Sequence, residues 1–294
     1  MADLSVSALT AQVFTGLVLG GVYVLLAIGL SLIFGLMTVV NFAHGSFYML
    51  GAYCGFFVLG RTGNFWLSLV LAPLLVGALG LVVERTLIRR LYGRSPDDPL
   101  LLTFGLSLVL VEAVRLLFGK IGLQLDPPRA LAGGVNLGFM TFPAYRLFVI
   151  AVTALVLVAL WAFLTRTNLG LIIRAGSRDP LMVRALGIDV GRVWFFVFGI
   201  GCGLAGLAGI LAGPMLGAYA EMGVTIVIQS FVVVVVGGMG SLLGAIVAGL
   251  LIGEVVSLTT FFVPKLTEIM VFVVMAVVLL ARPSGLFGEV GLLE

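Results

Sequence analysis

Long runs of apolar residues, separated by short polar stretches, extend along almost the whole chain. The first run, residues 9–37, contains no Asp, Glu, Lys or Arg, and a helix that spans a bilayer needs about 20 mostly apolar residues. Further runs follow at 46–60, 65–83, 100–118, 147–164, 193–213, 224–236, 243–263 and 266–280. The pattern predicts an all-α integral membrane protein, a polytopic helical bundle of about eight to nine membrane segments.

Two stretches interrupt this pattern. Residues 41–45 (Asn-Phe-Ala-His-Gly) and 237–241 (Gly-Gly-Met-Gly-Ser) lie between apolar segments that are too close for an aqueous loop. Non-helical backbone at membrane depth occurs where it is buried in protein or lines a cavity, and transporters use such breaks along their substrate paths. Each stretch is therefore either an interrupted helix or a tight turn at the membrane face, and the sequence leaves both interpretations open.

Arginines are concentrated in two loops, which sets the predicted orientation. Residues 84–98 and 166–192 hold Arg85, Arg89, Arg90 and Arg94, and Arg166, Arg174, Arg178, Arg184 and Arg192, respectively. Positive loops face the cytoplasm, and the two spans between them agree in parity. Residues 119–146 are then a periplasmic loop. The N-terminus is external if both runs in residues 9–60 cross the membrane, and internal if one is re-entrant.

Composition agrees with a membrane protein and excludes several other classes. Hydrophobic residues make up 62% of the 294 residues and charged residues only 10%, whereas a soluble domain carries about 25% charged residues. We therefore exclude a soluble enzyme, a nucleic-acid binder and a disordered protein. The net charge of +3 fits basic cytoplasmic loops better than a basic binding face.

No catalytic or cofactor motif is present in the sequence. His44 is the single histidine, and neither a GxSxG, an HExxH nor a Cys/His cluster occurs, so we expect no enzymatic activity, no metal and no cofactor. A GxxxxGK[ST] phosphate loop is also missing from the sequence. Energy for transport would then come from an ion gradient or from another subunit.

Glycines at GxxxG spacing are the most abundant motif. The pairs are Gly16/Gly20, Gly51/Gly55, Gly199/Gly203, Gly209/Gly213, Gly240/Gly244 and Gly249/Gly253. Small residues let helix backbones approach closely in a membrane. The motif therefore predicts tight helix packing and does not indicate a substrate.

A few polar residues inside or beside the apolar runs are candidates for a translocation pathway. They are Asn41, His44, Gly45 and Ser46 at the first break, Gly237 and Gly238 at the second, and Glu254 in the run 243–263. Ionisable groups at membrane depth are functional candidates by default. Alternatively, the polar residues of the first break satisfy its backbone. Gln229 is a weaker candidate, and Glu112 and Arg115 are predicted to form a structural pair.

The second basic loop contains a predicted short helix. Asp179 is a plausible N-cap with Pro180 at the first helical position, and Gly187 is placed to end the helix. Leu181, Ala185 and Ile188 would share one face. Such a helix either docks on a partner protein or lies on lipid headgroups.

Four stretches together resemble a known family, the permease subunits of ABC importers for branched-chain amino acids. They are residues 41–53 (NFAHGSFYMLGAY), the stretch from Glu84-Arg85 into 102–106 (LTFGL), residues 174–188 (RAGSRDPLMVRALGI), and residues 232–244 with 282–288 (RPSGLFG). The resemblance covers almost the whole chain, which is therefore treated as a single transmembrane permease domain, 1–294.

The resemblance implies a bacterial inner-membrane protein that pairs with a second, homologous permease. It also implies two cytoplasmic ATPase subunits and a periplasmic substrate-binding protein as partners, with no nucleic acid. The loop 166–192 would carry the coupling helix that docks on an ATPase, through Asp179, Arg184, Ala185, Leu186, Gly187 and Ile188. Amino-acid permeases of this kind often have Glu where this chain has Ser46. Relatives on the same scaffold handle urea, amides, or aromatic and other small carboxylates, so these substrates stay open.

A self-contained secondary carrier or channel is the alternative class of protein. It would transport without an ATPase, driven by an ion or substrate gradient. The scarcity of carboxylates inside the spans argues against proton or sodium coupling, although Glu254 keeps that possibility open.

Overall fold

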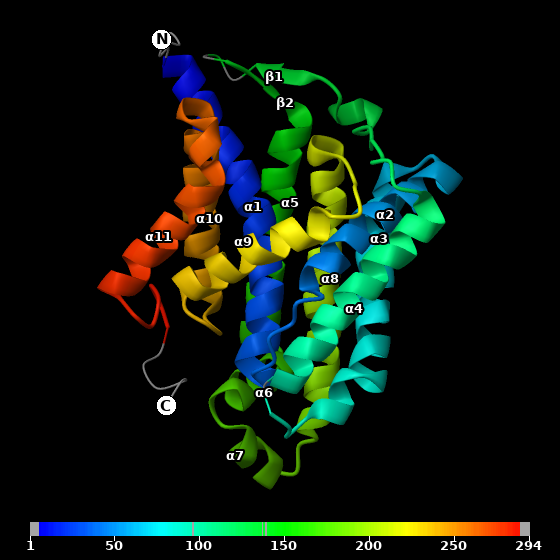
Figure 1. Cartoon of the computed structure of the whole chain (residues 1–294), viewed down its shortest axis with the longest axis vertical. Coiled ribbons are helices and arrows are strands. Elements are labelled where there is room, and N and C mark those ends of the chain that lie inside the picture. The colour runs from blue at the N-terminus through cyan, green and yellow to red at the C-terminus, as the bar shows by residue number, and fades with distance from the viewer. Residues whose placement is uncertain (1–5, 96, 137, 139, 289–294) are drawn as a thin grey trace.

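Helices make up nearly all of the secondary structure in the computed structural model (Figure 1). The structure describes residues 6–95, 97–136, 138 and 140–288. In chain order the elements are α1 (Val6–Met37), α2 (His44–Thr62), α3 (Phe65–Thr86), η1 (Ile88–Leu91), α4 (Asp97–Phe118), η2 (Arg129–Leu131), β1 (Gly134–Asn136), β2 (Thr141–Pro143), α5 (Ala144–Arg166), α6 (Asn168–Arg178), α7 (Pro180–Ala185), α8 (Val190–Leu216), α9 (Met222–Gly237), α10 (Leu242–Phe262), η3 (Pro264–Leu266) and α11 (Thr267–Ala281).

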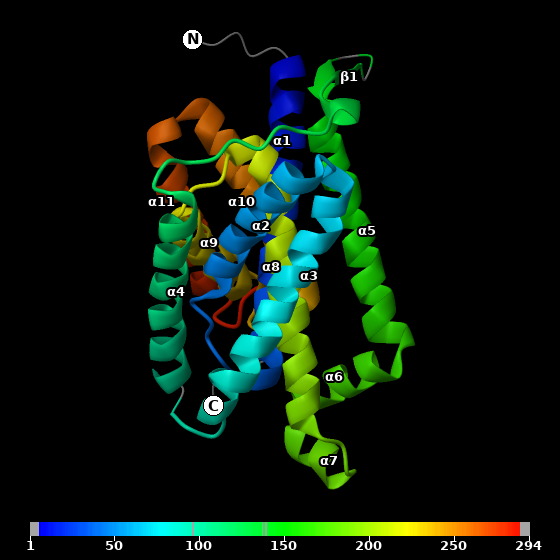
Figure 2. The same cartoon turned by 90° about the vertical axis from the view of Figure 1, so that its right-hand side faces the viewer.

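Two long helices, α1 and α8, form the centre of the bundle. α1 packs against α10 and α8, and α8 also packs against α2 and α3. In the most apolar stretch of α1, 83% of the residues are buried, compared with 17% in α5. Figures 1 and 2 show α4, α5 and α11 at the periphery. Their outward apolar side chains are therefore left to face lipid.

The number of membrane segments agrees with the prediction. Within the described residues, seven helical segments are long and apolar enough to span a membrane. α2 and the 16-residue α9 bring the number of membrane segments to nine. At 1.5 Å per residue α9 is about 24 Å long, shorter than a hydrocarbon core of about 30 Å. Figure 1 shows it lying obliquely across the other helices.

The directions of α1 and α2 show whether both runs in residues 9–60 cross the membrane, which decides the side on which α1 begins relative to the arginine-rich loops. α1 begins at the end of the molecule that carries β1 and β2, whereas α6 and α7 lie at the opposite end (Figure 1). α2 returns towards the end at which α1 begins (Figure 2). Both runs in residues 9–60 therefore cross, and the start of α1 is external when the arginine-rich loops are cytoplasmic.

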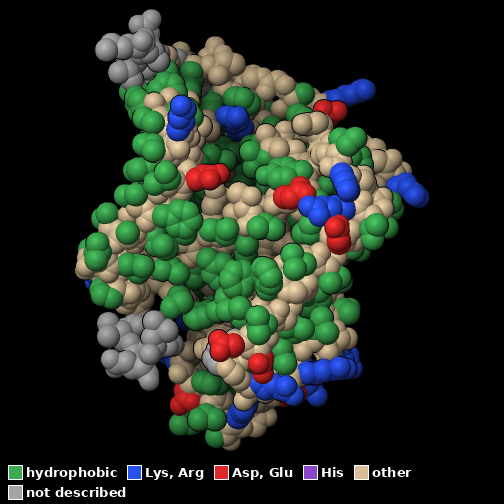
Figure 3. All heavy atoms as spheres, viewed as in Figure 1, with side chains coloured by type: hydrophobic (Ala, Val, Ile, Leu, Met, Phe, Trp, Pro, Cys, Tyr) green, Lys and Arg blue, Asp and Glu red, His purple; other side chains and the backbone are tan. Residues whose placement is uncertain are grey.

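Apolar side chains form a band across the middle of the face seen in Figure 3. Figure 3 shows green side chains across this band and blue and red ones gathered towards the two ends. Within residues 119–146 the structure adds a β-hairpin that the sequence pattern did not predict, with Val135 paired to Phe142. Leu123 and Ala218 also exchange backbone hydrogen bonds of 2.7 and 2.8 Å, which tie this loop to the end of α8.

Glycines make the closest helix contacts, as the GxxxG motifs predict. A Cβ added to Gly209 of α8 would overlap the backbone of Tyr48 in α2, and one added to Gly51 would overlap the backbone of Gly206. On the other side of the centre, Gly253 of α10 lies against the backbone of Gly20 in α1. These crossings are possible only without side chains.

The two breaks differ in form. Residues 38–43 leave the helical path after α1 and continue into the protein interior, where Asn41 is fully buried. This break is an interrupted helix. At the second break, residues 238–241 form a tight turn between α9 and α10, with Gly238 at φ +101° and Gly240 at φ +80°, a left-handed backbone that favours glycine.

Residues 282–288 cover the end of α9. The amides of Leu286 and Phe287 donate to the carbonyls of Val236 and Gly237, at 2.8 and 2.9 Å. Arg282 stabilises this tail by donating to the carbonyl of Leu286 at 2.7 Å. Carbonyls at the end of a helix have no partner in that helix, so the tail supplies donors that α9 lacks.

Candidate functional site

Thr103 of α4 satisfies the backbone of the first break. Its hydroxyl oxygen accepts from the amide of Phe42 at 3.1 Å. The hydroxyl hydrogen is within reach of the carbonyls of Val40, at 3.3 Å, and Leu100, at 3.1 Å. Thr103 is fully buried. A peripheral helix thus stabilises the non-helical backbone inside the bundle, and sequence analysis assigned no role to this residue.

Replacing Thr103 with valine is expected to destabilise the protein while keeping side-chain shape. The amide of Phe42 would lose its only described acceptor in a water-free interior, at a cost of about 1–3 kcal/mol. The melting temperature of the purified protein in detergent measures the effect. Thr165→Val is the matched control, because Thr165 is exposed and bonds only within its own helix, to Trp161. Equal melting temperatures for both variants would contradict this role of Thr103.

The predicted pathway side chains of the first break are enclosed by protein. Asn41 and His44 are 0% exposed and Ser46 is 2% exposed. The Nε2 of His44 lies 3.1 Å from the carbonyl of Leu26 in α1, so Nε2 carries the proton and donates. The Asn41 amide and the Nδ1 of His44 have no partner among the described residues. Buried polar groups without a partner are rare. Packing alone therefore does not explain these groups, and they remain candidates for a functional role.

The predicted glycines lie at backbone contacts. A Cβ on Gly45 would overlap the carbonyl of Gly223 at the start of α9, and one on Gly237 would overlap Gly244 of α10. A Cβ on Gly238 would reach the backbone of Gly288 in the tail. These glycines therefore set the distances between α2, α9, α10 and the tail around the two breaks.

Glu254 lies between α10 and α1. Its carboxylate occupies the space beside Gly16, where a Cβ would meet Oε1 at 2.8 Å, and Oε1 is buried without a described partner. One turn further, Ser257 donates to the carbonyl of Gln12 at 2.7 Å. The glycine in α1 thus makes room for a carboxylate inside an otherwise apolar contact.

A cavity of about 220 Å³ opens beside these elements. Its polar lining groups come from Tyr23, Tyr48, Tyr219, Thr225 and Gln229. Its apolar lining comes from Leu19, Val22, Leu216, Met222, Ile226 and Val256. A largely apolar cavity with a few polar groups is typical of a small-molecule site. The structure places Gln229 here, whereas Asn41, His44 and Glu254 are not among the lining residues.

The second arginine-rich loop folds into two helices, α6 and α7. Asp179 caps α7 as predicted, accepting from the amide of Met182 at 2.8 Å, with Pro180 at the first helical position. Gly187 follows the helix at φ +79°. Sequence analysis did not separate α6 from the loop.

The predicted apolar face of α7 is wrong. The helix ends at Ala185, so Ile188 lies outside it, and the side chain packed against the protein is Val183, which is 4% exposed. Leu181, Met182 and Leu186 are instead 73%, 58% and 73% exposed. In a segment of only six residues the pattern of apolar positions is too short to fix a face. The three exposed side chains, which we call the α7 tip, form an apolar surface at the end of the molecule that carries α6 and α7 (Figure 1).

An ion-pair cluster joins the end of α4 to the start of α9. Arg115 pairs with Glu112 at 3.2 Å, as predicted, and also with Glu221, which precedes α9. The hydrogen bond from Arg115 lowers the pKa of Glu221. Glu221 was missed because it is 106 residues away from Arg115 in the sequence.

The broken helix, the cavity beside it and the exposed α7 tip define a class of protein: a membrane-embedded transport subunit. Residues 12–280 match the family described as branched-chain amino acid transport system, permease component. The chain belongs to this family, and it is a multi-pass inner-membrane permease subunit of an ABC importer. This is a family of transport permeases and not of enzymes, and its members work with other components of ABC transporters.

Several known proteins are similar to this chain over most of its length. The high-affinity branched-chain amino acid transport system permease protein BraD of Pseudomonas aeruginosa is 31% identical, over 95% of each chain. LivH of Escherichia coli K12, of the same description, is 30% identical over 95% of each chain. LivM of E. coli K12 is 28% identical, over 90% of this chain and 67% of LivM. A solved structure, PsaBC from Streptococcus pneumoniae in complex with Fab, aligns with a TM-score of 0.46 and 14% identity, over 90% and 87% of the two chains.

Proposed function

We propose that this permease translocates branched-chain amino acids and that ATPase subunits drive it through the α7 tip. The observation that carries the proposal is the exposure of Leu181, Met182 and Leu186 at the cytoplasmic end. Exposed apolar clusters mark contact sites. The segment also contains the residues named above for coupling, with Asp179 and Gly187 fixing its ends. The loop 166–192 is therefore the proposed coupling loop.

The proposed substrate path runs through the cavity between α1, α2, α9 and α10. Its apolar lining suits an aliphatic side chain, and Tyr23, Thr225 and Gln229 offer partners for polar groups. His44, Gly45 and Ser46 form the start of α2, which also contributes Tyr48 to the cavity, and Asn41 precedes this helix. Gly237 and Gly238 lie at the end of α9, and Glu254 lies on α10. The unpartnered amide of Asn41 and the unpartnered Nδ1 of His44 support a second arrangement of α2 in which these groups gain partners.

The further partners in this proposal are a second, homologous permease and a periplasmic binding protein that delivers the substrate. The proposed substrate class is taken from the descriptions of the relatives BraD and LivH as branched-chain amino acid permeases. Ser46, which is buried and lies 3.5 Å from the carbonyl of Ser107, keeps urea, amides and small carboxylates as alternative substrates on this scaffold.

Purification from the native membrane in mild detergent tests the proposed assembly. Mass spectrometry is expected to find two ATPases and a second permease with this chain. The complex in proteoliposomes, with its binding protein and internal ATP, is then expected to take up leucine and not urea or benzoate. Uptake of urea or benzoate without uptake of leucine would contradict the proposed substrate and assign the permease to that alternative substrate instead. A lone chain that transports without any ATPase would contradict the proposal and favour the self-contained carrier.

A further inference from the structure

A buried carboxylate lies at the cytoplasmic end of α3, outside the sites described so far. Glu84 is 0% exposed. Its Oε1 accepts from the hydroxyl of Tyr92 and from the Nε of Arg89, the latter at 3.3 Å. Its Oε2 has no partner among the described residues. A buried, partly satisfied charge is a poor source of stability compared with an apolar side chain of the same size, so a role in stability alone does not explain it.

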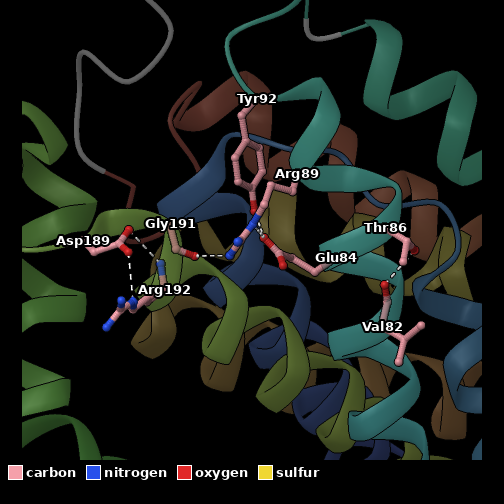
Figure 4. A network of polar contacts seen from close by, with 8 residues as sticks. All are labelled: Val82, Glu84, Thr86, Arg89, Tyr92, Asp189, Gly191 and Arg192. Atoms are coloured by element: carbon pink, nitrogen blue, oxygen red, sulfur yellow. Dashed lines mark hydrogen bonds and ion pairs between the residues drawn. The ribbon is translucent and has the colours of Figure 1, made fainter.

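Arg89 joins this carboxylate to the first turn of α8. Figure 4 shows its guanidinium between the carboxylate of Glu84 and the carbonyl of Gly191, to which it donates at 3.1 Å. The same guanidinium lies 5.9 Å from the ring centroid of Phe195. α3 and α8 are therefore fastened together where α8 begins, directly after the coupling loop.

Tyr92 continues the contacts towards α7. Its ring meets the ring of Trp194 edge-on, with centroids 4.7 Å apart. On α7, the guanidinium of Arg184 lies 5.6 Å from the centroid of Trp194. Burial and the neighbouring Glu84 raise the pKa of Tyr92, so its hydroxyl remains a donor. An unbroken series of contacts thus leads from Arg184 in α7 to Glu84 in α3. We call Arg184, Trp194, Tyr92, Arg89 and Glu84 the coupling network.

We propose that the coupling network transmits movement of α7 to α3, with Glu84 and Tyr92 as positioning residues. This inference rests on the proposed function, because it takes α7 to be the element that an ATPase moves. The indole Nε1 of Trp194 is a buried donor without a described partner. Oε2 of Glu84 is a buried acceptor that also lacks a described partner. Both residues contact Tyr92 through other atoms, Glu84 through Oε1 and Trp194 through its ring. The two unused groups supply partners for a second arrangement, which a two-state coupling element requires.

The position of α3 allows a displacement that reaches it from α7 to spread to other helices. α3 packs along α8 and also against α2, the helix that starts at the first break. A shift of α3 at its cytoplasmic end therefore reaches both the central helix and the broken helix. Rigid packed elements pass such displacements on because protein interiors are dense.

The test compares transport with ATP hydrolysis in the complete complex. Tyr92→Phe removes the hydroxyl but keeps the ring against Trp194. We expect the amount of leucine moved per ATP hydrolysed to fall about tenfold, while hydrolysis on the partner subunits continues. Glu84→Gln, which keeps an acceptor for Tyr92 but removes the charge, is expected to lower the same ratio. Thr86→Val is the matched control, because Thr86 lies at the same helix end but bonds only to Val82 (Figure 4).

The outcomes separate the two proposals. A Tyr92→Phe complex with a normal ratio of leucine to ATP would overturn the coupling network. A lower melting temperature with an unchanged ratio would also overturn it, because that is the result of a purely structural role. A wild-type complex that binds no ATPase would instead contradict the proposed function, and with it the basis of the network.

Discussion

Replacing Leu186 with aspartate is expected to abolish ATP-driven transport while the permease stays folded in the membrane. Leu186 is 73% exposed at the end of α7, so the fold does not depend on it. In the proposed interface an apolar contact would be replaced by a charge that must lose its water. A central apolar contact of this kind contributes about 2 kcal/mol or more to binding, which corresponds to a loss of affinity of at least about thirtyfold. Leucine uptake and the yield of co-purified ATPase both measure the effect.

The control for this variant is Ser177→Asp, which adds the same charge to the same loop. Ser177 lies in the last turn of α6, is exposed and bonds only to Arg174. We expect it to retain the ATPase. Equal ATPase yields and equal uptake for Leu186→Asp and Ser177→Asp would rule out docking through the α7 tip. They would favour the alternative in which α7 lies on lipid headgroups.

Gly209→Ala is expected to cause a large loss of stability through the addition of a single methyl group. Its Cβ would overlap the backbone of Tyr48, and the nearest atoms also include the amide of Ala52, 3.0 Å away. Backbone atoms in the middle of a helix cannot rotate aside as a side chain does, so α2 and α8 must separate along their length. The cost of overpacking is about 1–3 kcal/mol for flexible neighbours, and here we expect at least about 3 kcal/mol.

Gly105→Ala is the matched change for Gly209→Ala and has the opposite expected sign. Gly105 lies within α4, is exposed, and has nothing within 4 Å of an added Cβ. Alanine is favoured over glycine in a helix by about 1 kcal/mol, so a slight gain is expected. Thermal unfolding of the two purified variants measures both effects. A Gly209→Ala protein as stable as the Gly105→Ala protein would show that the α2–α8 crossing is looser than described.

The membrane segments and the helix ends in the loop 166–192 were predictable because their causes are local. Apolar runs set the spans, and the cap by Asp179 and the left-handed Gly187 depend on a few neighbouring residues. The orientation stays a prediction from the arginines of two loops, because charge asymmetry acts on whole loops. The glycine pairs correctly indicated close packing, although not which helices meet.

The support of the first break was not predictable, because it comes from another part of the chain. Thr103 reaches Phe42 across 61 residues of sequence, and a threonine in an apolar helix gives no local signal of that role. Glu221 as a partner of Arg115 was missed for the same reason. The coupling network was invisible too. Sequence shows Glu84 among arginines at a loop, a pattern typical of a solvated face, whereas the fold buries its carboxylate completely.

The contact between residues 282–288 and the end of α9 has a consequence for biosynthesis. The ribosome makes this tail after α9, α10 and α11. The carbonyls of Val236 and Gly237 therefore lack the amide donors of Leu286 and Phe287 until two further helices have been made. Unsatisfied carbonyls at membrane depth are costly. The end of α9 is therefore capped late, and a nascent chain stalled before residue 282 would hold the eight other membrane segments around a helix whose last carbonyls lack these donors.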